Sequence, residues 1–270
     1  MIGERQAESR DFWHEQWSAT DGNEPRDLWY AIDETKMSYL RPYLPETGLS
    51  LEVGCGTARL SRFLAAQGFR AVGLDYEPAA LELAAQRADD GRLNVALLLG
   101  DAFALPFATG SFDIVLSTGL LEHFADPSPI VAEMTRVLRP GGVFYSDIVP
   151  KKFALQRALE GLKLRRHEVW ERPFDKDEIE TLLRREGLLV KRVFAAGIFP
   201  PSLPLIGRRQ FLARLQDKTA LAFGRLTRPL DGTRLAELLG LYYFACAEKP
   251  VDGTGEGTAT TKAAANGRAA

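Results

Sequence analysis

"LEVGCGTARLSRFLAAQGF", residues 51–69, decides the fold of this chain. An apolar run that contains Glu52 leads into two glycines one residue apart, Gly54 and Gly56, and a helical pattern follows. Glycine lacks a Cβ atom, so the backbone at these two positions can turn sharply and approach a ligand closely. The first turn of the helix that follows presents free N–H groups to that ligand. The stretch therefore predicts a ligand-binding turn between a strand and a helix.

Strands and helices are predicted to alternate on both sides of this turn. The predicted strands are 49–54, 70–75, 93–100, 112–118 and 142–149, and the predicted helices are 58–68, 78–90 and 127–138. Arg139-Pro140-Gly141-Gly142 follows the end of the last of these helices. Apolar strands that alternate with helices are typical of a parallel sheet covered on both faces. Such a sheet binds its ligand beyond the carboxyl ends of its strands.

The pattern changes after Pro150. A basic amphipathic helix is predicted at 151–172, a second helix at 174–187, and strands at 188–197 and 239–249. The resulting domain organisation is an N-terminal helical lid at 1–48, a main domain at 49–250 with insertions at about 150–172 and 197–238, and a disordered tail at 251–270. The tail is assigned to disorder because Gly, Ala and Thr dominate it and little of it could be buried.

Composition narrows the class of protein. The net charge of −2 over 270 residues argues against a nucleic-acid partner. Cys55 and Cys246 are far apart and form neither a disulfide framework nor a zinc pattern, which favours a reducing, cytoplasmic location. No signal peptide and no apolar run of ~20 residues for a membrane span is seen. No group of His, Asp and Glu calls for a metal ion.

Two further carboxylates follow neighbouring predicted strands. Asp75 closes the second strand and can accept hydrogen bonds from ribose hydroxyls. Asp101 closes the third strand and can accept from an adenine amino group. A dinucleotide site would want a third glycine at position 59, where this chain has Arg59. Glu52 also suits a cationic ligand better than a pyrophosphate.

Five segments together resemble the class I S-adenosylmethionine-dependent methyltransferases, in particular their small-molecule branch. They are "LEVGCGTARL", "VGLDYEPAAL", "GDAFALPF", "SFDIVLSTGLLEHFADP" and "VLRPGG", and they occur in the family's order and spacing. The resemblance covers 49–149 well and 188–249 loosely. It implies a Rossmann-like, doubly wound sheet of seven mostly parallel strands, with the last strand antiparallel, plus helical cap insertions.

The resemblance also implies S-adenosylmethionine as the cofactor and assigns its contacts. Those contacts are Gly54, Cys55 and Gly56 along the methionine part, Glu52 beneath it near the amino group, Asp75 on the ribose, Tyr76 stacked on the adenine, Asp101 and Ala102 at the adenine edge, and Ser117 and Thr118 at the end of the fourth strand. Cys55 is interpreted as a small residue that the turn tolerates, since the sequence shows no base beside it.

His123 is the candidate catalytic residue. It lies just past the fourth predicted strand, and its ordinary pKa of about 6.5 would let it take a proton from an acceptor hydroxyl. The alternative is a structural histidine bonded to the backbone of this turn. The neighbouring Glu122 is interpreted as structural, with a cap or a metal ligand as the alternatives.

Two other features have two interpretations each. Trp13, His14, Trp17 and Tyr30 either form a lid that excludes water or simply pack a helix onto the sheet. The basic stretches at 151–166 and 208–228 are either solvated faces, or a cap that admits a lipophilic or anionic substrate or transiently touches a membrane surface.

The function that these observations favour is transfer of a methyl group from S-adenosylmethionine to O, N or C of a small, lipophilic acceptor. The alternatives are an RNA or protein methyltransferase, a non-catalytic cofactor-binding partner protein, and an NAD-dependent oxidoreductase. The sequence "STGLLEH" lacks the tetrapeptide typical of amino-group methyltransferases of nucleic acids, and the missing third glycine argues against NAD. The oligomeric state is not readable from the sequence.

Overall fold

The computed structural model describes residues 12–18, 26–88, 94–148, 171–172, 174–198 and 222–251, with the side chains of 26–31 left out. Most of the predicted basic helix at 151–172 and the predicted tail beyond Val251 lie outside these residues. So do much of the predicted insertion at 197–238 and the side chain of Tyr30. The domain boundaries therefore stay predictions.

In the described part of the chain, seven strands form a single sheet. They are β1 (Leu49–Val53), β2 (Arg70–Asp75), β3 (Val95–Leu99), β4 (Phe112–Thr118), β5 (Leu138–Ile148), β6 (Leu189–Ala196) and β7 (Tyr242–Glu248). Their order is β3-β2-β1-β4-β5-β7-β6, and β7 runs antiparallel to both of its neighbours. The predicted mostly parallel sheet with an antiparallel last strand is confirmed. The strand order reverses between β1 and β4, and this is where such sheets bind ligands.

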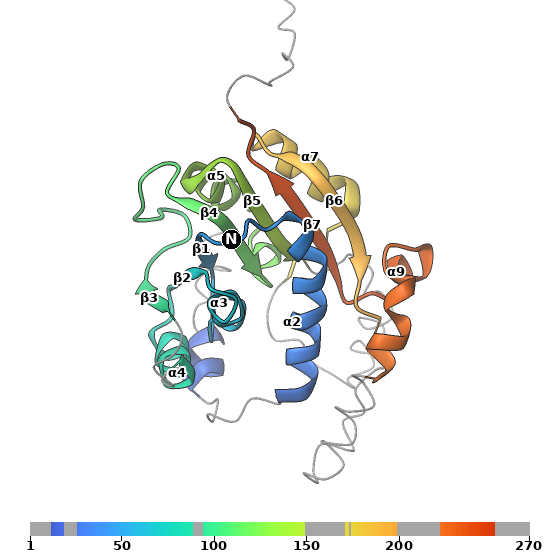
Figure 1. The fold of residues 1–270 in the computed structure, drawn as a ribbon, viewed down its shortest axis with the longest axis horizontal. Helices are drawn as coiled ribbons and strands as arrows, with labels where there is room; N and C mark the ends of the chain where they lie inside the picture. The colour runs from blue at the N-terminus through green and yellow to red at the C-terminus, as the bar shows by residue number, and fades with distance from the viewer. Residues whose placement is uncertain are drawn as a thin grey trace, which may run out of the picture.

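Helices cover both faces of the sheet (Figure 1). They are a helix at 12–18, α2 (Arg26–Leu40), η1 (Arg41–Tyr43), α3 (Arg59–Ala65), α4 (Pro78–Ala88), η2 (Leu121–His123), α5 (Ser128–Val137), α7 (Lys176–Arg185), a helix at 222–227, η3 (Arg228–Leu230) and α9 (Arg234–Leu239). None of the helices in the described ranges is long and apolar enough to cross a membrane.

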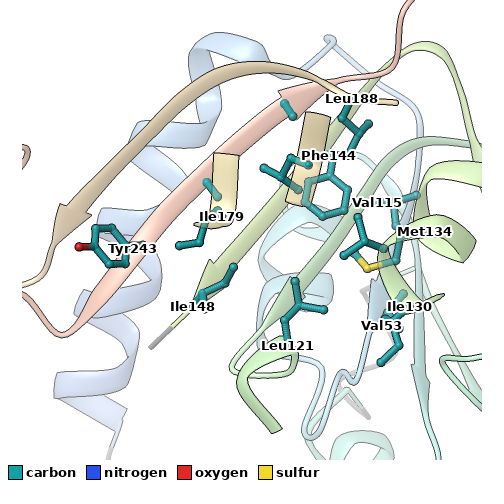
Figure 2. Packing of buried hydrophobic residues seen from close by; sticks show 14 of the residues in the cluster. Val53, Val115, Leu121, Ile130, Met134, Phe144, Ile148, Ile179, Leu188 and Tyr243 are labelled. Atoms are coloured by element: carbon teal, nitrogen blue, oxygen red, sulfur yellow. The ribbon is translucent and has the colours of Figure 1, made fainter. Parts of the chain in front are cut away.

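Each face of the sheet has its own hydrophobic core. On one face, Met37 and Leu40 of α2 pack with Leu60 and Leu64 of α3 over the strands. On the other face, α5 packs against β4 and β5, and α7 packs against β6 and β7 (Figure 2). Buried residues three and four apart on a helix share one face, which is why these segments form amphipathic helices here. A fully buried aliphatic side chain contributes about 1.5–3 kcal/mol, so both layers hold the carboxyl edge of the sheet rigidly.

One predicted boundary is wrong. The fifth strand is predicted to begin at Gly142, but β5 already begins at Leu138, which pairs with Phe112 of β4. A register irregularity between Phe112 and Ile114 accommodates the early start. Gly141, at φ +72°, bends the strand, and its N–H donates to the carbonyl oxygen of Lys249 at 2.8 Å. The segment extends because distant strands pair with it, which the local turn chemistry does not reveal.

Candidate functional site

The glycine turn lies at the carboxyl end of β1. Gly54 and Gly56 have φ of +66° and +49°, values that favour glycine. The N–H groups of Gly54 and Cys55 both donate to the carbonyl oxygen of Leu74 in β2, at 2.8 and 3.0 Å. The turn is therefore fixed to the neighbouring strand.

Asp75, the last residue of β2, holds this turn. Its Oδ2 accepts from the N–H of Gly56 at 2.7 Å, and its Oδ1 accepts from the N–H of Glu77 at 3.0 Å. Burial raises the pKa of the carboxyl, although the backbone N–H of Gly56 and that of Glu77 both act to lower it. Each oxygen keeps a second lone pair, so Asp75 can still accept from ligand hydroxyls at the edge.

Glu52 lies beneath the turn. It is only 2% exposed, and its Oε2 accepts from the backbone N–H and the hydroxyl of Ser61 in α3, at 2.8 and 2.6 Å. Burial raises its pKa to about 7, and the two hydrogen bonds from Ser61 oppose that rise. Glu52 therefore ties β1 to α3. The predicted contact of Glu52 with a cofactor amino group stays a prediction.

The side chain of Cys55 points into the protein. It packs with Ala58, which precedes α3, and with Ala84 of α4. A Cβ atom on Gly73 in β2 would lie 2.9 Å from its Sγ. Burial raises the pKa of this thiol well above its ordinary value. A buried thiol with a raised pKa is a poor nucleophile. Only the backbone of Cys55 is left for the predicted ligand contact.

The ends of β2 and β3 provide the predicted adenine side of the site. Tyr76 is half-buried directly after Asp75. Asp101 is exposed, and its Oδ1 accepts from the N–H of Phe103 at 2.9 Å, which shapes the turn that carries Ala102. The carboxylate of Asp101 thus lies near the same edge as Asp75 but is less constrained by the protein.

The end of β4 provides the opposite side of the site. Thr118 is half-buried at the end of the strand. The hydroxyl of Ser117 is buried, with its Oγ 3.0 Å from the Oγ of Ser146 in β5, and its predicted contact with the cofactor stays a prediction. His123 is the last residue of η2, and its backbone N–H donates to the carbonyl oxygen of Leu120 at 3.1 Å. Its half-buried ring forms a T-shaped contact with the ring of Trp13, with the ring centroids 5.3 Å apart.

The helix at 12–18 contacts the residues that follow three different strands. Trp17 covers Gly56, where an added Cβ atom would lie 3.1 Å from the indole ring. Nδ1 of His14 lies 3.0 Å from Oε1 of Glu77, and Trp13 contacts His123. These contacts place aromatic rings over the glycine turn and beside η2. Whether this helix acts as a lid stays a prediction.

The residues at this edge fit an adenosyl ligand. Gly54 and Gly56 have no Cβ atom to fill the space at the end of β1, and the buried Asp75 carboxylate still has capacity to accept from sugar hydroxyls. Among the described residues, no group of three or more His, Cys, Asp and Glu side chains could hold a metal ion.

Comparisons with known proteins agree with this geometry. Residues 51–146 match the family model described as "Methyltransferase domain". A "Ubiquinone biosynthesis O-methyltransferase" of Cereibacter sphaeroides is 31% identical over 154 residues, which is 54% of this chain and 62% of that protein. The protein of the same name from Methylococcus capsulatus is 34% identical over 136 residues, covering 49% of this chain and 56% of that one. The chain thus matches less than two thirds of the length of these relatives.

Solved structures share the fold at low identity. A "[4+2]-Cyclase SpnF" has a TM-score of 0.59 at 22% identity, covering 85% of both chains. A "putative sarcosine dimethylglycine methyltransferase" from Galdieria sulphuraria has a TM-score of 0.57 at 18% identity, covering 90% of this chain and 98% of that one. The first of these proteins is named as a cyclase, so the fold by itself does not give the reaction.

The match of residues 51–146 to a methyltransferase domain, the strand order and the glycine turn together support a class I S-adenosylmethionine-dependent methyltransferase. The cofactor that this family implies is S-adenosylmethionine.

Three charged residues behind the site went unrecognised in the sequence. Asp33 and Lys36 of α2 and Asp147 of β5 are all buried near the carboxyl edge. A charge inside the apolar run "FYSDIV" was the available signal for Asp147. Its partner Lys36 is more than 100 positions away in the chain, so no local pattern could identify the pair.

Proposed function

We propose that this chain transfers a methyl group from S-adenosylmethionine to a hydroxyl oxygen of a small, lipophilic acceptor. The observation that carries the proposal is the glycine turn fixed to Asp75 at the carboxyl edge of a sheet with this strand order. The O-methyltransferase names of the relatives support oxygen as the acceptor atom. His123 supports it too, because a hydroxyl acceptor benefits from a base.

The proposed mechanism relies mainly on alignment. The bound cofactor supplies a methyl group that is already activated on a sulfonium. Asp75 would hold the ribose hydroxyls, and the glycine turn at Gly54 and Gly56 would line the methionine part. The rings of Trp13 and Trp17 would exclude water from the reacting groups. A ring nitrogen of His123 would take the proton from the acceptor hydroxyl as its oxygen attacks the methyl carbon.

The test is transfer of a labelled methyl group to an alkyl-substituted catechol, compared with an alkylamine of similar size. We expect label on the catechol, and a loss of about 100-fold in kcat for His123→Gln with the affinity for S-adenosylhomocysteine within threefold. Arg139→Met is the control, because Arg139 pairs with Asp113 at the opposite edge of the sheet and its loss should leave kcat unchanged. Label on the amine alone would refute oxygen as the acceptor, and an unchanged kcat for His123→Gln would refute the base.

We also propose a cytoplasmic location with transient contact to a membrane surface. Both cysteines are free and buried, as expected in a reducing compartment. Leu226 and Leu238 are 77% and 67% exposed, close to Arg225 and Arg234, which suits the interface of an anionic bilayer. Sedimentation with anionic vesicles, compared with neutral ones, tests the contact. Equal recovery with both vesicles would contradict it.

A further inference from the structure

Helix α2 carries two charged side chains on the face that packs against the sheet. Asp33 and Lys36 lie one turn apart and are only 4% and 5% exposed. Burying charges is costly, and even a well-paired buried ion pair is often no better for stability than an apolar pair. The pairs that these two residues form therefore call for a reason other than stability.

The first pair connects α2 to the glycine turn. Nε of Arg59 donates to Oδ2 of Asp33 at 2.8 Å. Arg59 is the first residue of α3, and the preceding Ala58 completes the turn at the left-handed φ of +54°. Any shift of Asp33 is thus transmitted to the end of the turn that faces the cofactor.

The second pair connects α2 to the turn after β4. Nζ of Lys36 lies 2.7 Å from Oδ2 of Asp147, which also accepts from the hydroxyl of Tyr145 at 3.2 Å. The other oxygen, Oδ1, accepts from the N–H of Gly119 at 3.1 Å. Gly119 has a φ of +59° and begins the turn that leads into η2 and His123.

The two turns also contact each other. A Cβ atom on Gly54 would lie 2.7 Å from the side chain of Leu120, the residue after Gly119. The glycine turn and the turn after β4 therefore share one packed interface, and α2 holds each of them through a separate buried pair.

We propose that Asp33 and Lys36 are positioning residues that together set the spacing between the cofactor and the acceptor-side His123. Asp33 fixes the glycine turn through Arg59, and Lys36 fixes the turn after β4 through Asp147. The assignment rests on the proposed function for its catalytic consequence, whereas the mechanical coupling stands on the contacts alone. Substitution of Asp33 should therefore impair cofactor binding and substitution of Lys36 should impair turnover, although both residues lie on α2.

The first part of the test follows hydrogen exchange of backbone amides by mass spectrometry. Asp33→Asn should raise exchange in a peptide covering 53–60 by about tenfold and leave 117–124 within twofold. The double variant Lys36→Met/Asp147→Leu replaces the buried ion pair with apolar side chains, so the protein should still fold. Exchange should then rise mainly in the peptide covering 117–124. Lys36→Arg keeps the charge and should restore wild-type exchange. Equal changes in both peptides, or none in either, would overturn the proposal whether or not the protein is a methyltransferase.

The second part measures binding and turnover well below the melting temperature. Asp33→Asn should weaken S-adenosylhomocysteine binding about tenfold with kcat at saturating cofactor within threefold. Lys36→Met/Asp147→Leu should lower kcat at least about 30-fold with binding within threefold. Identical losses in the two variants would overturn the proposal. Absence of binding and turnover in the wild type would refute the proposed function instead, and the exchange data would then decide the positioning role.

Discussion

The carboxyl and amino edges of the sheet both hold charged side chains, but they bury them to different extents. At the carboxyl edge, Glu52, Asp75 and Lys36 are almost fully buried. At the amino edge, Arg139 pairs with Asp113 while its own side chain is 49% exposed. Half-exposed ion pairs add little to the stability of the fold and lose little hydration, whereas a buried charge carries a large desolvation cost. Such a cost is retained where the geometry of the buried charge serves a function.

The amino edge uses its charges to terminate secondary structure. Nζ of Lys249 donates to the carbonyl oxygens of Thr135 and Leu138, at 2.8 and 2.7 Å, where α5 ends. Oδ2 of Asp113 accepts from the N–H of Leu49, where β1 begins. These contacts stabilise the end of a helix and the start of a strand. The difference between the edges teaches that the charges buried at the carboxyl edge hold the turns of the site, whereas the charges at the amino edge hold the ends of a helix and a strand.

The largest effect is expected at Asp75. Asp75→Ala removes the acceptor for Gly56 and the proposed ribose contact, so affinity for S-adenosylhomocysteine should fall at least about 100-fold. Asp101→Ala is the matched control on the neighbouring strand. Because Asp101 is exposed, we expect a loss of only about 3- to 10-fold by calorimetric titration. Equal losses in the two variants would remove the distinction between the two carboxylates.

Glu52→Gln tests the cost of burying a carboxyl at this edge. The folded pKa of about 7 lies above the ordinary 4.5, so the folded state retains a proton that the unfolded state loses. The stability that this difference provides is complete below about pH 4.5 and is lost as the pH rises to about 7; it amounts to about 3 kcal/mol.

The measurement for Glu52 is the free energy of unfolding in urea from pH 5 to pH 8, in the wild type and in Glu52→Gln. The wild type should lose more stability than the variant over this range. Parallel curves for the two proteins would show that Glu52 titrates normally in the folded state.

Trp17→Ala tests whether the helix at 12–18 belongs to the carboxyl edge. The indole covers Gly56, so its removal should weaken S-adenosylhomocysteine binding about tenfold by exposing the turn to water. Trp17→Phe retains an aromatic ring and should recover most of the affinity. If the alanine variant binds as tightly as the wild type, the helix packs on the sheet without covering the ligand.

The smallest effect is expected at the amino edge. Arg139→Met breaks the half-exposed pair with Asp113 and should lower the free energy of unfolding by at most about 1 kcal/mol. The affinity for S-adenosylhomocysteine should not change, and one titration series with thermal unfolding checks both. A loss of affinity would show that the two edges are coupled through the sheet.

Local patterns predicted most of the scaffold, because strand and helix periodicities depend on near neighbours. They found β4 at its observed bounds and placed Asp75 at the end of β2. They missed the early start of β5, since Leu138 is extended by pairing with Phe112.

The site was only partly predictable for the same reason. Asp75 follows directly from its place after a strand, but the direction of the Cys55 side chain depends on packing against α4. The link between Lys36 and Asp147 joins distant parts of the chain, and so does the contact of Trp17 with Gly56. Such tertiary contacts override or extend what local residues indicate.

The most direct measurement of the central claim is calorimetric titration of the wild-type protein with S-adenosylmethionine, S-adenosylhomocysteine and NAD. The account predicts one site per chain with micromolar affinity for both adenosyl ligands and no heat of binding for NAD. Folded protein that binds NAD, or that binds none of the three, would contradict the assignment of the carboxyl edge as an adenosyl-cofactor site.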